Sequence, residues 1–345
     1  MMQYPIRPTV HDIAREAGVS LATVDRVLNA RPGVREETIA RVQAVVDRIG
    51  YVRDTFAANL ARQRLYRFAF VLPEGPGQFV ETLSEALTEA HASNVVDRVV
   101  LRIVHVPTHD PEAVVRMLSD LGDEGVDGVA LMTPETPQVR DAVARLKADG
   151  LAVVAIASDL PSSMRDYFIG INNLAAGRTA GLLMGRFLRG PGEVLVVTNS
   201  MRSRDSLERR LGFDAVMSED FPDQRILPSV ESFDDPGRMA EIVREVMQAR
   251  PMVRGIYSMG TGNTALLAAL RASGRAGQVV VIGHELTPTT RSALQEGEMA
   301  AVIAQNTGHL VRSALRVLRA LCDQRPIVEA QEQIRIDLIV RENLP

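Results

Sequence analysis

The chain has 345 residues, of which 46% are hydrophobic, so it is long enough for two or three domains with their own apolar cores. Its net charge of −4 gives no overall sign of a nucleic-acid-binding protein. The single cysteine, Cys322, excludes a disulfide within the chain and fits a reducing compartment. The N-terminus has no apolar signal core, and no stretch reaches about 18 apolar residues, so we expect a cytoplasmic protein without a membrane span.

Charge is distributed unevenly along the chain. Residues 1–67 carry a net charge of +4, whereas the remainder carries −8. A basic head on an acidic body predicts that any polyanion binds at the N-terminus.

The basic head begins with the segment VHDIAREAGVSLATVDRVLN at residues 10–29. Apolar residues recur at helical spacing on either side of Gly18, which can end a first helix, and Ser20, which can cap a second. This pattern predicts a helix-turn-helix whose second helix enters a DNA major groove. An ordinary helical hairpin is the alternative, but a third amphipathic pattern at residues 34–50 favours a complete small domain.

The segment from VHDIAREAGVS to DRIGY resembles the head of the lactose-repressor (LacI/GalR) family of bacterial transcription regulators. The resemblance continues through nearly the whole chain. It implies a DNA-binding domain at residues 1–52, a hinge helix and linker at 53–66, and an effector-binding and dimerisation domain at 67–345. The last would comprise an N-lobe (about 67–171 plus 305–334) and a C-lobe (about 172–304 plus 335–345).

By this resemblance, the start of the second helix reads bases. Arg26 can contact guanine through two hydrogen bonds, whereas Leu21 and Ala22 offer only apolar contact. Asp25 departs from the family pattern, where serine is common, and needs a nearby arginine to neutralise it beside phosphate. The expected contacts of the head with DNA, with threonine and serine hydroxyls on phosphate, are Thr9, Ser20, Leu21, Ala22, Thr23, Arg26 and Asn29.

The segment DTFAANLAR at residues 54–62 matches the hinge helix of the family. In relatives a leucine of this helix wedges into the minor groove, which kinks the duplex. Leu60 matches that leucine, and Ala57 matches the small residue at which two hinge helices pack. The alternative for Leu60 is a plain linker contact.

From residue 67 onward, β-rich apolar runs alternate with helical patterns, such as those at 79–91, 111–124 and 137–149. The runs that predict strands are RFAFVLP, VVLRIVHV, GVALMTP and AVVAIAS in a first set and GEVLVVTN, RILPSVES, GIYSMG and VVVIGHE in a second. Two such sets predict an α/β body of two lobes, each a parallel sheet flanked by helices. The predicted fold class is therefore an all-α helix-turn-helix head on a two-lobed body, and the body resembles periplasmic sugar-binding proteins.

Ligands of parallel α/β sheets sit at the carboxyl ends of the strands, so polar residues there are candidates for a cleft site. Phe79 could stack on a sugar ring or be the first core residue of its helix. Arg209 and Gln305 match polar ligand residues of the family, and Glu285 stands where many relatives have aspartate. Arg209 and Glu285 could instead pair with each other. The expected ligand-binding residues are Gln78, Phe79, Asp159, Asp205, Arg209, Asn263, Glu285 and Gln305.

The sequence thus predicts a sequence-specific DNA-binding regulator, a repressor, whose operator affinity is controlled by a sugar or polyol. Its expected partners are a near-palindromic operator and a second copy of the chain, with a tetramer left open. We expect no enzymatic activity, cofactor or metal site.

Two other functions stay open at this point. Gly260-x-Gly262-x-x-Ala265 followed by Glu285 is nearly a dinucleotide-binding fingerprint, typical of an NAD-dependent oxidoreductase. A free sugar-binding protein is the other, although it needs a signal peptide. His105 and His109 have metal-like spacing but no evident third ligand.

Overall fold

The computed structural model describes residues 8–28, 31–51, 64–75, 77–94, 98–107 and 110–345. The chain divides into two compact units, Met1–Arg64 and Leu65–Pro345, called here the head and the body. Within the described ranges, no helix is both long and apolar enough to cross a membrane.

The head consists of three helices, α1 (Val10–Ala17), α2 (Leu21–Leu28) and α3 (Glu36–Ile49). Thr9 begins α1 with a capping box to Asp12, and Gly18 ends it in the left-handed conformation. Ser20 Oγ accepts a hydrogen bond of 3.2 Å from the backbone N–H of Thr23, which caps α2. The turn between the helices therefore forms as the sequence predicts.

One apolar side of each helix forms the core of the head. Ile13 and Ala17 of α1 pack with Val24 of α2 and with Val42 and Val45 of α3. Val24 is the fully buried residue of α2, and Val27 and Leu28 are partly buried against the same core, which leaves Leu21, Ala22, Asp25 and Arg26 exposed.

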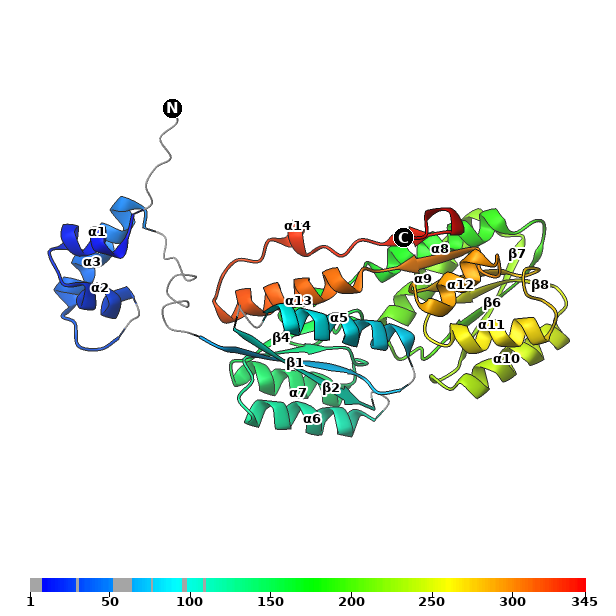
Figure 1. Cartoon of the computed structure of the whole chain (residues 1–345), viewed down its shortest axis with the longest axis horizontal. Coiled ribbons are helices and arrows are strands. Elements are labelled where there is room, and N and C mark those ends of the chain that lie inside the picture. Colours follow the sequence, from blue (N-terminus) through cyan, green and yellow to red (C-terminus); the bar gives the residue numbers. More distant parts are fainter. Residues whose placement is uncertain (1–7, 29–30, 52–63, 76, 95–97, 108–109) are drawn as a thin grey trace, which may run out of the picture. The chain divides into compact units, whose positions relative to one another are not determined.

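The first lobe of the body is a parallel sheet in the order β2-β1-β3-β4-β5. Figure 1 shows α5 and α13 on one side of this sheet and α6 and α7 on the other. Its strands are β1 (Tyr66–Pro73), β2 (Val99–Val106), β3 (Gly128–Leu131), β4 (Ala152–Ile156) and β5 (Tyr167–Ile169). Its helices are α5 (Gln78–Asn94), α6 (Pro111–Asp123), α7 (Pro137–Ala148) and α13 (Thr307–Cys322).

Alternate residues of β1 enter two different cores. Phe70 packs with Leu83 of α5, whereas its neighbour Val71 packs with Leu118 of α6. A strand buried on both faces has no polar side to show, which explains the continuous apolar run in the sequence.

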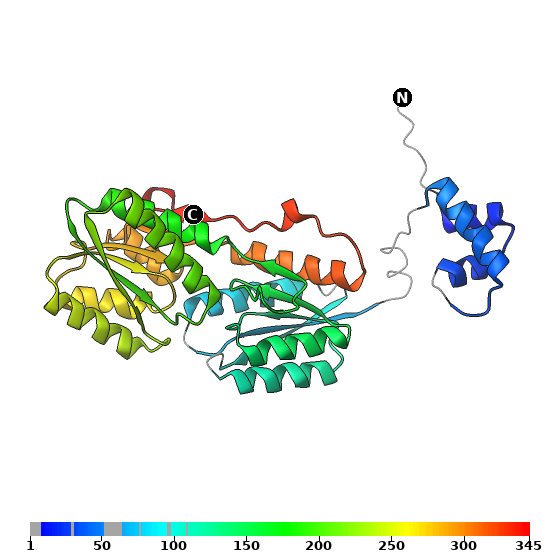
Figure 2. The same ribbon diagram turned by 180° about the vertical axis from the view of Figure 1, so that it is seen from behind.

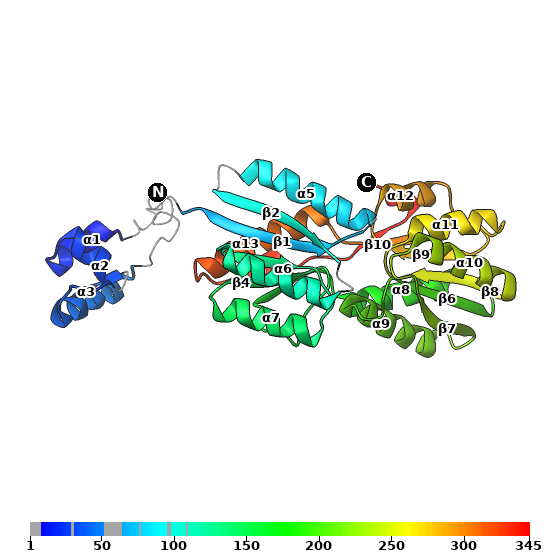
Figure 3. The same ribbon diagram turned by 90° about the horizontal axis from the view of Figure 1, so that it is seen from below.

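The second lobe is a six-stranded sheet in the order β11-β10-β9-β8-β6-β7, with β11 antiparallel to β10. Figures 2 and 3 show α8 and α9 on one side of it and α10, α11 and α12 on the other. Its strands are β6 (Gly192–Thr198), β7 (Gln224–Glu231), β8 (Val253–Ser258), β9 (Val280–His284), β10 (Ala301–Ala304) and β11 (Asp337–Ile339). Its helices are α8 (Asn173–Phe187), α9 (Arg204–Asp220), α10 (Pro236–Ala249), α11 (Asn263–Ala272) and α12 (Pro288–Gln295), and the short α14 (Glu329–Glu332) and η1 (Arg341–Asn343) lie near the C-terminus.

The chain passes between the lobes more than once. It enters the second lobe after β5, returns to the first as α13, which packs against α5, and ends in the second with β11. The strands β5, β10 and β11 were not among those that the sequence pattern predicts.

Helices α8 and α9 cross at a very short distance. A Cβ added at Gly177 would lie 2.0 Å from the carbonyl oxygen of Arg209, and one added at Gly212 would lie 2.1 Å from that of Leu174. Only glycine permits this approach. The crossing fixes the position of the α9 segment that carries Arg209.

Candidate effector cleft and DNA-reading surface

The first candidate site is the outer surface of α2. Leu21, Ala22 and Arg26 are exposed, and Thr23 is half-buried. The hydroxyl groups of Ser20 and Thr23 lie 2.9 Å apart. Because its apolar contacts are made from the opposite side, the helix offers its N-terminal turn and Arg26 to a partner.

Asp25 lies beside an arginine, as a phosphate-facing carboxylate would require. Arg31 Nη1 is 3.2 Å from Asp25 Oδ2, and both side chains are more than half exposed. This ion pair offsets the negative charge on the reading surface, although so exposed a pair adds little to stability. Three of the DNA-contact predictions, for Asn29, Ala57 and Leu60, fall outside the described residues.

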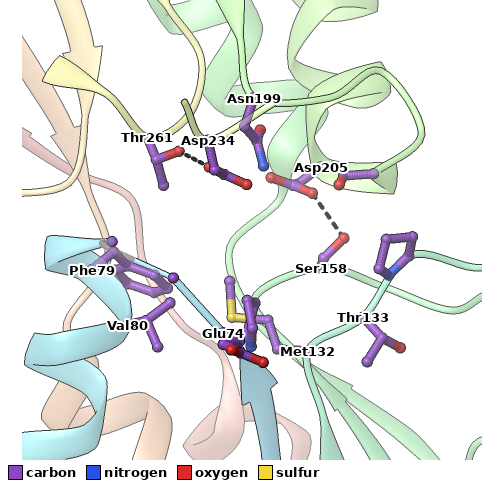
Figure 4. Close-up of a pocket in the computed structure, with 15 residues that line it drawn as sticks. Glu74, Phe79, Val80, Met132, Thr133, Ser158, Asn199, Asp205, Asp234 and Thr261 are labelled. Atoms are coloured by element: carbon purple, nitrogen blue, oxygen red, sulfur yellow. Dashed lines mark hydrogen bonds between the residues drawn. The ribbon is translucent and has the colours of Figure 1, made fainter. Parts of the chain in front are cut away.

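The second candidate site is a cavity of about 90 Å³ where the carboxyl ends of strands from both lobes meet. Figure 4 shows Asn199, Asp205, Asp234 and Thr261 on one side of it, and Phe79 across from them. We call it the cleft cavity. It is lined from the first lobe by Pro73, Glu74, Gly75, Gly77, Phe79, Val80, Met132, Thr133, Pro134 and Ser158, and from the second by Asn199, Ser203, Asp205, Asp234 and Thr261.

One hydrogen bond joins the two lobes across this cavity. Ser158, which follows β4, donates from Oγ to Asp205 Oδ1 at 2.8 Å. Asp205 lies in the first turn of α9, in the second lobe. A ligand that inserts between these groups must replace the bond or add to it, so the cavity is coupled to the separation of the lobes.

Arg209 is buried one turn after Asp205, with 4% of its surface exposed. Its Nε donates to Asn173 Oδ1 at 2.8 Å, and its Nη1 donates to the carbonyl oxygen of Met259 at 2.6 Å. Two carboxylates lie further away, with Asp205 Oδ2 at 3.8 Å from Nη1 and Glu285 Oε1 at 4.0 Å from Nη2. The guanidinium therefore ties α8, α9 and the end of β8 together.

Glu285 follows β9 with a left-handed backbone, at a φ of 67°. Its Oε1 accepts a hydrogen bond of 2.9 Å from Gln305 Nε2, and its own N–H donates to the carbonyl oxygen of Ile303. Burial raises the pKa of Glu285 to about 6, and the opposing effects of Arg209 and Gln305 are smaller. The carboxyl group is thus poised between its two protonation states at mildly acidic pH.

A fully buried aromatic pair, Tyr257 and His284, lies beside Arg209 and Glu285. Tyr257 and His284 Nε2 share a hydrogen bond of 2.9 Å, and the Tyr257 ring stacks on Phe213 with centroids 4.6 Å apart. Burial, followed by the charge of Arg209, holds the pKa of His284 well below its usual range, so the ring is neutral. Asn263 Nδ2 donates to the His284 carbonyl oxygen at 3.3 Å.

Comparison with known families identifies the two units. Residues 68–326 match the model of the periplasmic binding protein domain, which is more than half of the chain. The chain belongs to this family. Residues 9–54 match the model of bacterial regulatory proteins of the lacI family, so this periplasmic-binding-protein body carries a LacI-type head.

Curated relatives match about half of the chain at low identity. Catabolite control protein A of Priestia megaterium is 28% identical over 167 residues, which are 46% of this chain and 48% of that protein. The HTH-type transcriptional regulator DegA of Bacillus subtilis is 25% identical over 177 residues, 51% of each chain. The chain therefore spans about half the length of each of these relatives.

Solved structures confirm the fold of the body. A glucose-galactose binding protein, GanP from Geobacillus stearothermophilus, superposes with a TM-score of 0.72 at 21% identity, covering 82% of this chain and 99% of that one. A putative LacI transcriptional regulator from Bacteroides fragilis gives 0.69 at 19% identity, covering 81% and 98%. The two-lobed α/β prediction is thereby confirmed.

Within this periplasmic-binding-protein body, the predicted ligand residues separate into three groups. Phe79 and Asp205 line the cleft cavity. Phe79 also belongs to the apolar core, with 8% of its surface exposed, and its stacking on a ligand stays a prediction. Arg209, Asn263, Glu285 and Gln305 form a buried polar cluster that is not part of the cavity lining, so their contact with a ligand stays a prediction. The pairing of Arg209 with Glu285 occurs at the long distance of 4.0 Å.

Two predicted ligand residues lie elsewhere. Gln78 is the first residue of α5, does not line the cavity, and its carbonyl oxygen accepts from Thr82 Oγ1. Asp159 also lies off the cavity, because both of its carboxylate oxygens accept hydrogen bonds from Arg165. Neither residue lines the cleft cavity in this structure, and the ligand role expected for each stays a prediction.

The expected ligand set omits several polar lining residues. Five of them follow a strand at its carboxyl end, which is the signal that could have found them. They are Glu74, Thr133, Asn199, Asp234 and Thr261.

The glycines of the dinucleotide-like motif have no open space beside them, which argues against the dinucleotide-binding alternative. A Cβ at Gly260 would lie 2.7 Å from Asn199 Oδ1, and one at Gly262 would lie 2.8 Å from the Met239 methyl group. These glycines accommodate neighbouring side chains, so the space that a pyrophosphate would need beside the backbone is filled. His105 lies 3.5 Å from Ser84 Oγ, and His109 lies outside the described residues.

Proposed function

We propose that this protein is a sequence-specific DNA-binding transcriptional regulator, a repressor, whose operator affinity is set by a small polyhydroxylated ligand in the cleft cavity. It would act in the cytoplasm as a homodimer on a near-palindromic operator, without catalysis. The observation that carries the proposal is the presence, in one chain, of a LacI-type head and a two-lobed body with a polar cavity between its lobes.

The head supports the DNA-binding half of the proposal. Arg26 is exposed on α2 and carries a fork of donors that suits the O6 and N7 atoms of guanine. Leu21 and Ala22 precede it on the exposed surface and would meet an apolar group such as the thymine methyl. Two heads on a dimer would read two half-sites of opposite direction, which predicts the palindrome.

The body supports the ligand-binding half. Phe79 offers an aromatic surface, and Ser158, Asn199 and Asp205 offer hydrogen-bonding groups from both lobes. A ligand that contacts both sides stabilises one lobe arrangement over the other. Only such a difference in affinity can shift the protein between a DNA-binding and a released state.

In vitro selection of DNA by the full chain tests the first half. We expect an enriched near-palindromic motif whose preference at one base pair per half-site disappears in Arg26→Ala. Arg41→Ala is the matched control, because Arg41 is an exposed arginine that belongs to α3 and not to the reading helix. Absence of any enriched motif would contradict DNA recognition and leave a ligand-binding protein.

A further inference from the structure

We propose that Asp25 is a second base-reading residue of α2 and selects a cytosine in the major groove, close to the guanine that Arg26 contacts. This inference rests on the proposed function and deepens it, because it names part of the operator sequence. It gives the carboxylate of Asp25 a favourable partner on DNA, in addition to the arginine that offsets its charge.

Asp25 belongs to the same exposed surface of α2 as Arg26. The exposed residues of this helix are Leu21, Ala22, Asp25 and Arg26. Residues four apart on a helix lie one above the other, so Asp25 follows Leu21 and Arg26 follows Ala22 on one side. A partner that meets Arg26 and the first turn of α2 therefore also meets the carboxylate of Asp25.

The chemistry of the major groove decides which base accepts this carboxylate. Guanine presents two acceptors there and thymine presents one, so both repel it. Adenine has an amino donor, but its N7 acceptor lies beside that donor. Cytosine presents its N4 amino group without an acceptor on the same base, and aspartate accepts a hydrogen bond from it. An exposed aspartate on the reading surface therefore favours cytosine over the other three bases.

Arg31 makes this acceptor compatible with the charge of DNA. Its Nη1 lies 3.2 Å from Asp25 Oδ2, and its backbone N–H donates to the carbonyl oxygen of Arg26 at 2.8 Å. The backbone bond keeps Arg31 at the end of α2, where its charge offsets that of Asp25. The Asp25 side chain is still 53% exposed, and a carboxylate offers up to about four acceptor positions, more than one ion pair occupies.

Arg26 keeps its own donors for a base. Among the described residues of the head, the arginines that form ion pairs are Arg15, Arg31 and Arg48, and Arg26 is not one of them. Its guanidinium can therefore contact O6 and N7 of a guanine while Asp25 contacts a cytosine. The two side chains have opposite preferences, because the cytosine amino group repels Arg26 and the guanine acceptors repel Asp25.

Selection of DNA by the full chain, followed by fluorescence anisotropy on single duplexes, tests the inference. The parent protein and Asp25→Asn are selected in parallel, and the base pair whose preference differs between them is identified. We expect the parent to prefer cytosine at that position. Replacing the cytosine and its paired base by any other pair should weaken binding by the parent about tenfold.

Asp25→Asn should lose the preference for cytosine and favour adenine, because an amide accepts from N6 and donates to N7 of that base. The guanine preference that depends on Arg26 should be unchanged. Asp47→Asn is the matched control, since Asp47 is an exposed aspartate that belongs to α3 and not to α2, and it should alter neither preference. Melting temperatures of the variants verify folding.

Arg31→Ala separates reading by Asp25 from a role in positioning Arg31. It should weaken binding to all sequences by a similar factor and keep the cytosine preference, because it removes a positive charge and leaves the acceptor in place. Loss of the cytosine preference in this variant would show that Asp25 acts only through Arg31, which would overturn the inference.

Two other results would overturn the inference and leave the DNA-binding regulator intact. One is the same enriched motif for the parent and for Asp25→Asn. The other is a preference of the parent for a base other than cytosine at the position that Asp25→Asn changes. Absence of any enriched motif for the parent would overturn both this inference and the DNA-recognition part of the proposed function.

Discussion

Replacing Glu285 by glutamine should stabilise the body at neutral pH. The Glu285 side chain is only 13% exposed, and burial raises its pKa to about 6 from an ordinary value of 4.5. The ionised form is therefore less favourable in the folded chain than in the unfolded one. Glutamine keeps the shape of the protonated acid and cannot ionise.

The magnitude follows from the two pKa values. Between pH 4.5 and 6 the unfolded chain has lost the proton that the folded chain still holds, so this group lowers the free energy of unfolding as the pH rises. The loss is complete above pH 6 and amounts to about 2 kcal/mol. For a body of this size that corresponds to about 4 °C in melting temperature.

The local hydrogen bonds tolerate this substitution. An amide oxygen at position 285 can still accept from Gln305 Nε2. The new amino group has a possible acceptor in Gln305 Oε1, which lacks a hydrogen-bond partner among the described residues. The attraction to Arg209 is lost, but it is already included in the pKa of about 6.

Scanning fluorimetry of both proteins from pH 4 to 8 measures the effect as a difference, which removes the contribution of all other titrating groups. The melting temperature of Glu285→Gln minus that of the parent should be near zero at pH 4 and reach its maximum above pH 6.5. A negative difference at pH 7.5, or one that does not change with pH, would refute the reasoning.

Four further predictions concern other parts of the chain. Glu332→Gln should lower the melting temperature at pH 7, the opposite of Glu285→Gln. Burial alone would raise the pKa of Glu332, but hydrogen bonds from Arg316 and Ser313 lower it overall, so the ionised form is favoured by folding. In the same fluorimetry scan, the difference from the parent should shrink as the pH falls below 4.5. Gly212→Ala should lower the melting temperature by several degrees, about 3 kcal/mol or more, because its Cβ would overlap a carbonyl oxygen of α8; an unchanged melting curve would contradict the close crossing. Ser158→Ala should lower the free energy of unfolding by about 1.5 kcal/mol and open the lobes in small-angle scattering, and identical scattering would show that its bond does not hold them. Arg26→Ala should cost about 1–3 kcal/mol on the selected operator and much less on random DNA by anisotropy; equal losses would remove its base-reading role.

The helices of the head and the main strands of the body were predictable because their ends and their apolar patterns depend on residues close together in the sequence. Gly18 ends α1 and Ser20 caps α2 in the conformations that these residue types favour. Strands covered on both sides, such as β1 and β6, appear as continuous apolar runs.

Short strands escaped prediction because their pairing depends on distant segments. β5 has three residues, and β11 pairs antiparallel with β10 only after the chain has returned from the first lobe. Neither has a pattern long enough to distinguish a strand from a loop.

The candidate site was only partly predictable, for a different reason. The position of polar residues after strands locates the edge of the sheet, but it does not say which of these side chains will form hydrogen bonds or ion pairs with other residues and so be kept out of the cavity. Asp159 is engaged by Arg165, whereas Asp234 enters the cavity because two consecutive residues adopt a left-handed backbone. Both outcomes depend on tertiary contacts that spacing alone does not encode.

The central claim is that occupancy of the cleft cavity controls DNA binding. Its most direct test is the affinity of the full chain for its selected operator, measured by fluorescence anisotropy with and without a ligand that raises the melting temperature. The account predicts a loss of affinity of about 100-fold, which corresponds to a coupling free energy of about 3 kcal/mol. An operator affinity that is the same at zero and saturating ligand would contradict it.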